Sequence, residues 1–362
     1  MDIKAAIVRA PHAPFVIEPV RLDAPRDDEV LVKLTATGVC HTDIAIVEQI
    51  LPLPMPYVLG HEGAGEVVEV GKSVTAVGKG DHVVLTFGSC GQCHPCASGH
   101  PGYCVSQPAL NFAARRPDGS ATVHDATGAP VNAVFFGQSS FATHCISPVR
   151  NVIKVRRDAP LRYLGPLGCG LMTGAGAVLN VLKPQPDSTF VIFGTGALGF
   201  AALFAAKLAG CKRIVAVDRV GSRLDLAHQL GACEVIDTST SDLDTALADI
   251  GGCDAALDTT GVPRVIEAAV RSLKPCGQLG LVGASTESTM SLNIMHMISG
   301  RVLRGIVEGD SDPTRFIPLL VERFLGGTFP IDRIAGFYAF EDINAAVDAS
   351  TSGKTIKSIL TF

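Results

Sequence analysis

The stretch Phe190-Val191-Ile192-Phe193-Gly194-Thr195-Gly196-Ala197-Leu198-Gly199 predicts the fold of the second half of the chain. Its four apolar residues indicate a buried strand, and a helix of small apolar residues follows the glycines as far as Ala209. Gly194 allows the turn, Gly196 lets the backbone approach a pyrophosphate, and Gly199 lets the helix pack on the strand. Because a helix N-terminus favours negative phosphate, the stretch predicts a dinucleotide-binding fold.

Asp218 ends the next predicted strand, Arg213–Asp218, and lies nineteen residues beyond Gly199. A carboxylate at this place accepts hydrogen bonds from ribose hydroxyls and repels a 2′-phosphate, which favours NAD over NADP. Two other interpretations stay open. Asp218 caps the following turn, or Arg219 beside it serves a phosphate.

Strands and helices alternate through residues 171–308, which we expect to form this coenzyme domain. Such alternation predicts a doubly wound parallel sheet with helices on both faces. The expected helices are 171–182, 222–230, 242–249 and 263–273, and the expected further strands are 233–236, 254–258 and 278–283.

Residues 1–170 have the pattern of a compact β-rich domain with frequent glycine turns. Residues 113–132 are polar and contain Arg115 and Arg116, and we expect them to form an exposed excursion. Residues 309–362 are expected to contain two helices and to return to the first domain through a final strand. The expected strands are 5–9, 29–35, 66–70, 82–87, 140–148 and 356–362, and the expected helices are 313–325 and 341–350.

Four cysteines with short spacings, Cys90, Cys93, Cys96 and Cys104, give the most specific signal in the chain. Four thiolates on one loop suit a closed tetrahedral zinc site, which stabilises the loop and leaves no position for water. An iron–sulfur cluster is the alternative, since four thiolates also suit one.

His61 and Glu62 lie in the glycine-rich run Gly60-His61-Glu62-Gly63-Ala64-Gly65. A lone histidine says little, but Cys40 and Cys169 also lie in glycine-containing segments. Two thiolates, one imidazole and one open position make a catalytic rather than a structural zinc site.

The composition bounds the class of protein. The chain has 362 residues, 47% of them hydrophobic and 18% charged, so it is long and apolar enough for two folded domains. A net charge of -5 without a basic run argues against nucleic acid and anionic membranes as partners. We expect a cytoplasmic protein, because there is no long apolar run and no signal-peptide pattern. We expect the other cysteines to be core residues: Cys145, Cys211, Cys233, Cys253 and Cys276.

The chain resembles the zinc-dependent medium-chain alcohol dehydrogenases over its whole length, and among them the bacterial aryl-alcohol and terpene-alcohol enzymes. The segments that carry the resemblance are 135–141 (FFGQSSF), 168–176 (GCGLMTGAG) and 304–310 (RGIVEGD). It implies a GroES-like catalytic domain, a Rossmann coenzyme domain, two zinc ions, NAD and a homodimer or homotetramer.

The resemblance also implies roles for single residues. It places the catalytic zinc on Cys40, His61 and Cys169, with Glu62 as an acid that can approach the metal. Further residues match family positions: Thr42 in the proton relay, Asp43 as the partner of the His61 ring, and His41, Thr173, Arg223, Val282 and Lys357 near the coenzyme.

One position departs from the family. Many members have a histidine, the outer end of the proton relay, five residues after the first cysteine ligand, where this chain has Ala45. The expected reaction is the reversible oxidation of a primary alcohol to its aldehyde by hydride transfer to NAD. Alternatives are a polyol or formaldehyde-type dehydrogenase, a general aliphatic alcohol dehydrogenase, and a non-catalytic protein that kept the fold.

Apolar residues near the ligand segments suggest the kind of alcohol. An aromatic wall would favour benzyl-type or allylic terpene alcohols over ethanol, although each phenylalanine can also be an ordinary core residue. The residues concerned are Phe87, Phe112, Phe135, Phe136, Leu51, Leu53 and Pro54.

Overall fold

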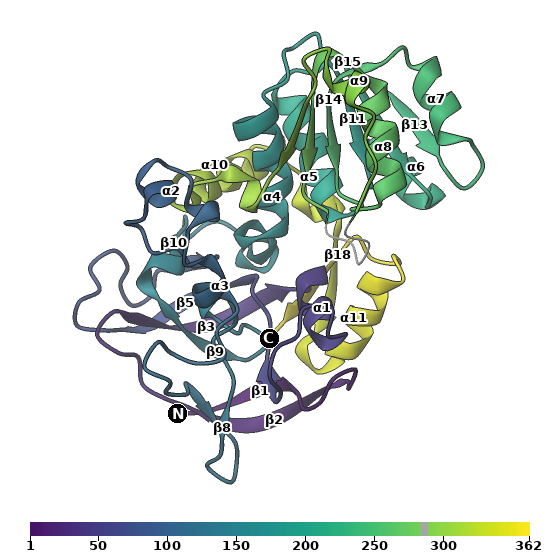
Figure 1. Ribbon diagram of the computed structural model, residues 1–362. Coiled ribbons are helices and arrows are strands. Elements are labelled where there is room, and N and C mark those ends of the chain that lie inside the picture. Colours follow the sequence, from purple (N-terminus) through teal and green to yellow (C-terminus); the bar gives the residue numbers. More distant parts are fainter. Residues whose placement is uncertain (284–288) are drawn as a thin grey trace. The chain divides into compact units, whose positions relative to one another are not determined.

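The computed structural model describes residues 1–283 and 289–362, and the chain divides into two compact units (Figure 1). Unit 1 comprises Met1–Cys169, Asp312–Gly326 and Ile331–Phe362. Unit 2 comprises Gly170–Ser311 and Gly327–Pro330. In the described part of the chain no helix is both long and apolar enough to cross a bilayer.

Unit 1 contains two sheets, of strand order β4-β1-β2-β7-β8 and β10-β6-β5-β3-β18-β17, and β9 pairs with β3 in the second. Val30, Val32 and Leu34 of β3 lie in one core with residues of β5 and β6, as their alternation predicted. The strands are β1 (Asp2–Val8), β2 (Phe15–Leu22), β3 (Glu29–Gly38), β4 (Tyr57–Val58), β5 (Gly63–Val70), β6 (His82–Leu85), β7 (Val123–His124), β8 (Pro130–Val131), β9 (His144–Pro148), β10 (Val152–Lys154), β17 (Ala335–Ala339) and β18 (Lys357–Thr361). The helices are α1 (His41–Val47), α2 (His94–Ala97), α3 (Gln107–Asn111), α10 (Pro313–Leu325) and α11 (Ile343–Thr351).

The C-terminal strand β18 lies inside the larger sheet, between β3 and β17 (Figure 1). It pairs antiparallel with β3, with Ile359 opposite Gly38, and the N–H of Val39 donates to the carbonyl of Ser358 at 2.9 Å. The predicted return of the chain to its first domain is therefore confirmed. The pairing holds the backbone just before Cys40 against the end of the chain.

The prediction of an exposed excursion over 113–132 is wrong for much of the segment. Strands β7 and β8 form a hairpin within it, and Arg116 is only 6% exposed. The Arg116 guanidinium donates to both carboxylate oxygens of Glu29, at 2.7 Å each. Glu29 begins strand β3. The ion pair between these distant residues therefore buries part of a segment whose polar composition had predicted a surface loop.

Unit 2 contains one sheet of order β13-β12-β11-β14-β15-β16, and every pair in it is parallel, as predicted. Its strands are β11 (Thr189–Phe193), β12 (Arg213–Asp218), β13 (Glu234–Asp237), β14 (Cys253–Asp258), β15 (Leu273–Leu281) and β16 (Val302–Gly305). Its helices are α4 (Gly170–Gly176), which continues as a π-helical turn over Ala177–Leu182, α5 (Ala197–Leu208), α6 (Gly221–Gln229), α7 (Leu243–Asp249), α8 (Pro263–Ser272) and α9 (Ile294–Met297).

Both faces of this sheet are covered. Val191 and Phe193 of β11 pack in a core that includes residues of α7 and α8. Phe190 and Ile192 alternate with them and point to the other face, where they are also buried. The pattern predicted from the opening stretch is thus confirmed, with β11 in the middle of the sheet and its carboxyl end at the glycines.

Two of the five cysteines expected in the core are exposed. Cys145 and Cys253 are buried and Cys211 is half-buried, but Cys233 and Cys276 are exposed. Cys233 directly precedes the edge strand β13, and Cys276 lies at an irregularity of β15 with a φ of 63°. The apolar residues around Cys233 and Cys276 therefore did not predict burial, because an edge strand and a bulge leave side chains in solvent.

Candidate active site and metal centres

Unit 1 brings together the four residues expected around a catalytic metal. One ligand atom from each of Cys40, His61, Glu62 and Cys169 lies within 4.8 Å of the others. Cys40 precedes helix α1, His61 and Glu62 precede strand β5, and Cys169 follows a 3-10 turn. The cluster thus joins distant segments of the chain, since Cys40 and Cys169 are 129 positions apart in the sequence.

Asp43 fixes the histidine of this cluster. Its carboxylate is fully buried and accepts hydrogen bonds from the backbone N–H groups of Cys40 and Gly60 and from Nδ1 of His61, each at 3.0 Å. Such a partner sets the tautomer and the orientation of a ligating imidazole. The structure therefore places Asp43 where the family resemblance implied.

The donor set fits a zinc ion. With Nδ1 of His61 engaged by Asp43, its buried Nε2 has no hydrogen-bond partner among residues 1–283 and 289–362. Hydrogen bonding with Cys169 lowers the pKa of the Cys40 thiol well below its ordinary value, against the effect of burial. Two sulfurs, one of them readily ionised, and an unsatisfied imidazole nitrogen are the ligands zinc prefers.

Lys357 lies at Glu62. Its ammonium is 2.5 Å from a carboxylate oxygen of Glu62 and donates to the carbonyl of Val39 at 2.9 Å, and both charged side chains are buried. Burial raises the pKa of Glu62 to about 7, although the Lys357 charge opposes this. The structure thus places Lys357, which was expected near a pyrophosphate, in an ion pair with the acid of the metal cluster.

Aromatic rings surround the His61 imidazole. The Phe136 ring stacks on it with centroids 4.4 Å apart, and the Phe135 ring meets it edge-on at 5.3 Å. Phe112 packs against both phenylalanines, at 6.0 and 5.5 Å. Three of the residues expected to form an aromatic wall therefore lie together at the ligand, whereas Leu51 is 43% exposed.

Helix α1 carries the remaining residues expected at this centre. The Thr42 hydroxyl lies 3.7 Å from Sγ of Cys40. His41 is exposed, and Ala45 is partly buried one turn further along. Thr42 is thus close to the metal cluster, while His41 points to solvent in unit 1.

The four-cysteine loop converges as its spacing predicted. One sulfur from each of Cys90, Cys93, Cys96 and Cys104 lies within 4.8 Å of the others. Backbone N–H groups donate to these sulfurs, and those of Gln92 and Cys93 lower the pKa of Cys90 to about 6. The four sulfurs therefore converge as the ligands of a single ion would.

The glycine loop of unit 2 has the geometry of a dinucleotide cradle. Gly194 has a φ of 90°, and a Cβ at Gly199 would collide with the Gly194 carbonyl. A Cβ at Gly196 would meet no other described atom within 4 Å, so open space lies beside this backbone. These are the three roles that the sequence assigned to the glycines.

Asp218 already makes four hydrogen bonds. One oxygen accepts from the N–H and the hydroxyl of Thr195, both at 2.6 Å, and the other accepts from the N–H groups of Arg219 and Val220. Asp218 therefore caps the turn, as one interpretation held, and also holds the glycine loop. Sequence reasoning gave Thr195 no role, and only its place between the two glycines could have suggested one.

Other expected coenzyme contacts lie at separate places in unit 2. Thr173 of α4 is buried, and its hydroxyl donates to the buried carboxylate of Glu308 at 3.3 Å. The buried Nε of Arg223 has no hydrogen-bond partner in the described part of the chain. Val282 directly follows strand β15. Glu308 is a buried acid that sequence reasoning missed.

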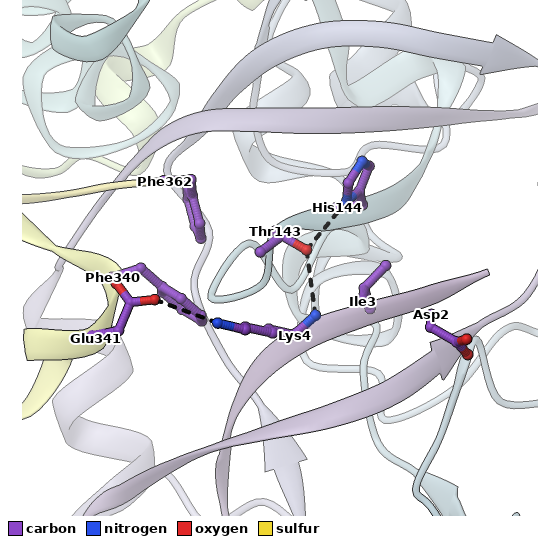
Figure 2. Close-up of a pocket in the computed structure, with 8 residues that line it drawn as sticks. All are labelled: Asp2, Ile3, Lys4, Thr143, His144, Phe340, Glu341 and Phe362. Atoms are coloured by element: carbon purple, nitrogen blue, oxygen red, sulfur yellow. Dashed lines mark hydrogen bonds and ion pairs between the residues drawn. The ribbon is translucent and has the colours of Figure 1, made fainter.

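A cavity of about 500 Å³ lies elsewhere in unit 1. It is lined by the start of β1, by Thr143 and His144, and by residues near the C-terminus, and Figure 2 shows the Lys4 ammonium pointing toward Glu341. None of the predicted site residues lines this cavity. We therefore assign no part of the metal chemistry to it.

Comparison with known proteins gives the family. The model of the alcohol dehydrogenase GroES-like domain matches residues 26–157, and that of the zinc-binding dehydrogenases matches residues 197–322. The geraniol dehydrogenase of Castellaniella defragrans is 43% identical over 368 residues, covering 100% of this chain and 98% of that protein.

Two crystal structures are similar over 100% of this chain and 99% of their own. One is an alcohol dehydrogenase zinc-binding domain protein from Burkholderia ambifaria, with 48% identity and a TM-score of 0.98. The other is the benzyl alcohol dehydrogenase of Acinetobacter calcoaceticus, with 43% identity and a TM-score of 0.96. With its GroES-like and Rossmann domains, the chain belongs to the zinc-dependent medium-chain alcohol dehydrogenases.

Proposed function

We propose that this alcohol dehydrogenase transfers a hydride between NAD and a primary aryl or allylic alcohol. The observation that carries the proposal is the cluster of Cys40, His61 and Cys169, with the aromatic rings of Phe135 and Phe136 against its imidazole. A zinc ion there would supply Lewis acidity that lowers the pKa of an alcohol.

The chain supplies orientation and a route for the proton. Asp43 holds the His61 ring, and Glu62 is held by Lys357. The Thr42 hydroxyl is the group that takes the alcohol proton. Since Ala45 replaces the usual histidine, the proton passes onward to water without a side-chain base at that position.

We propose two zinc ions per subunit with unequal roles, the second held by Cys90, Cys93, Cys96 and Cys104. A closed site contributes folding energy, whereas an open site is needed for turnover. Cys169→Ser should therefore abolish turnover with little loss of stability, and Cys96→Ser should chiefly lower the unfolding temperature. Metal analysis that finds one zinc or none, or finds iron, in active protein would contradict this assignment.

NAD is the proposed coenzyme. The Asp218 carboxylate at the end of β12, beside the glycine loop, supports this choice because it would repel a 2′-phosphate. Asp218→Ser should lower the ratio of kcat/KM with NAD to kcat/KM with NADP. A higher kcat/KM with NADP in the unaltered enzyme would instead favour a phosphate-binding role for Arg219.

The substrate assignment is tested with a panel of alcohols. We expect kcat/KM for benzyl-type alcohols to exceed that for ethanol by at least about 100-fold, or about 2.7 kcal/mol. The similarity to a geraniol dehydrogenase favours allylic terpene alcohols as a second candidate, so geraniol belongs in the panel. Similar values for ethanol and benzyl alcohol would refute the aromatic-wall argument.

We also propose a cytoplasmic homo-oligomer without nucleic acid or membrane partners. Strand β16 is an edge of its sheet, and exposed apolar residues precede it in the chain, among them Ile294, Met295 and Ile298. Such a surface supports self-association. No disulfide joins any of the cysteines among residues 1–283 and 289–362, which supports a reducing compartment. Light scattering coupled to size exclusion tests the first point, since a monomer at micromolar concentration would contradict it.

A further inference from the structure

Gln138 makes an unusual pair of hydrogen bonds at the metal ligands. Its side chain is 1% exposed, its Nε2 donates to the carbonyl of His61 at 2.9 Å, and its Oε1 accepts from the N–H of Gly63 at 3.1 Å. One amide therefore spans Glu62, satisfying the backbone on both sides of it. A strand would make such a pair with its own backbone, and here a side chain takes that place.

The backbone around Gln138 turns sharply to present this amide. Phe136, Gly137 and Ser139 have φ values of 49°, 64° and 50°. Two of these residues are not glycine, and side chains adopt such conformations only where the surroundings impose them. The same segment places the Phe136 ring on the His61 imidazole.

Other backbone groups of the ligand stretch bond to backbone partners. The N–H groups of Phe141 and Ser140 donate to the carbonyls of Leu59 and Gly60, and the Glu62 carbonyl accepts from the N–H of Gly38. In this stretch the carbonyl of His61 and the N–H of Gly63 depend on a side chain, that of Gln138. Removing the amide would leave two buried backbone groups unsatisfied.

We propose that Gln138 is a positioning residue of the catalytic metal centre, which it serves by fixing the backbone of His61–Gly63 while Phe136 fixes the imidazole plane. The inference rests on the proposed metal site at Cys40, His61 and Cys169. It assigns Gln138 no contact with the substrate. Its effect reaches the reaction through the direction of the His61 ring and of the Glu62 side chain.

The test is metal binding by Gln138→Leu and Gln138→Asn. Leucine removes both hydrogen bonds, and asparagine is too short to make both at once. Changes in groups that orient a ligand typically weaken metal binding by about 10–100-fold. We expect that loss in Gln138→Leu and a smaller one in Gln138→Asn, measured by zinc competition with a chromogenic chelator. The visible spectrum of the cobalt-substituted centre should also change.

Asn344→Leu is the matched control. The Asn344 amide likewise bonds both the N–H and the carbonyl of one residue, Phe15, at 2.9 Å each, and it lies outside the ligand stretch. This variant should lose stability while keeping the zinc affinity and the cobalt spectrum. The inference is overturned if Gln138→Leu and Gln138→Asn lose stability alone, with affinity within about threefold of the unaltered enzyme and the same spectrum.

These measurements need no alcohol turnover, so they separate two kinds of failure. If the unaltered protein binds no zinc or cobalt at Cys40, His61 and Cys169, the proposed function fails together with the inference. If it binds the metal but oxidises no alcohol, the substrate proposal fails and the role of Gln138 is still decided by affinity and spectrum.

Discussion

Replacing Arg116 by methionine should destabilise unit 1 by about 3–4 kcal/mol at pH 7. The Arg116 and Glu29 side chains are only 5% and 9% exposed, and two 2.7 Å hydrogen bonds join them. Removing one partner of a buried pair typically costs about 3–5 kcal/mol.

Arg116→Met combined with Glu29→Gln should recover most of the loss at pH 7, because no buried charge is then stranded.

Urea unfolding followed by tyrosine fluorescence measures the loss of stability in unit 1. The chain has no tryptophan, and its four tyrosines, at 57, 103, 163 and 338, all lie in unit 1. Arg115→Met is the control, because the ion pair with Glu29 is made by the neighbouring Arg116. Arg115→Met should change the free energy of unfolding by no more than about 0.5 kcal/mol. A deficit below about 1 kcal/mol at pH 7, or no recovery when Glu29→Gln is added, would refute the reasoning.

Three further predictions concern charged groups. Asp43→Asn should weaken zinc binding at the open site by about 10–100-fold in chelator competition, and an unchanged affinity would contradict its role at the ring. The Ser120 hydroxyl and N–H lower the pKa of Asp118 to about 2, below the unfolded value of about 3.9, so its stabilisation is present above pH 4 and lost toward pH 2. Asp118→Asn should therefore lower the urea midpoint at pH 7 and hardly at pH 2, and equal losses would speak against this. Lys357→Met removes the cation beside Glu62 and should raise the pKa of that acid further above about 7, which infrared difference spectra against Glu62→Gln would show as a carboxylic acid band at pH 7.

The sequence predicted what depends on local patterns. The strand and glycine turn at 190–199 are a local pattern, and they predicted the fold of unit 2. The convergence of the cysteine loop followed from a second local pattern, the short spacing of Cys90, Cys93, Cys96 and Cys104. Strand β2 was missed because Glu18 and Pro19 interrupt its apolar alternation.

The rest depends on pairings between distant residues. Arg116 meets Glu29, and Gln138 meets His61, across 87 and 77 positions. Nothing near Arg116 in the sequence distinguishes it from a solvent-exposed arginine, and the segment 135–141 gives no sign of which groups the Gln138 amide contacts. Only the completed sheet, with β3 and β5 at its centre, buries these side chains and selects their partners.

The position of strand β18 also constrains when the metal centre can form during synthesis. All the residues of the cluster are made once Cys169 has been added, but β3 still lacks its neighbour β18, and Glu62 lacks Lys357. At about 5–20 residues per second, the ribosome needs roughly 10–40 s more to reach Lys357. During that interval the two thiols and Glu62 belong to a unit whose strand β3 still has no β18 beside it. The nascent chain therefore completes the proposed metal site only near the end of its own translation.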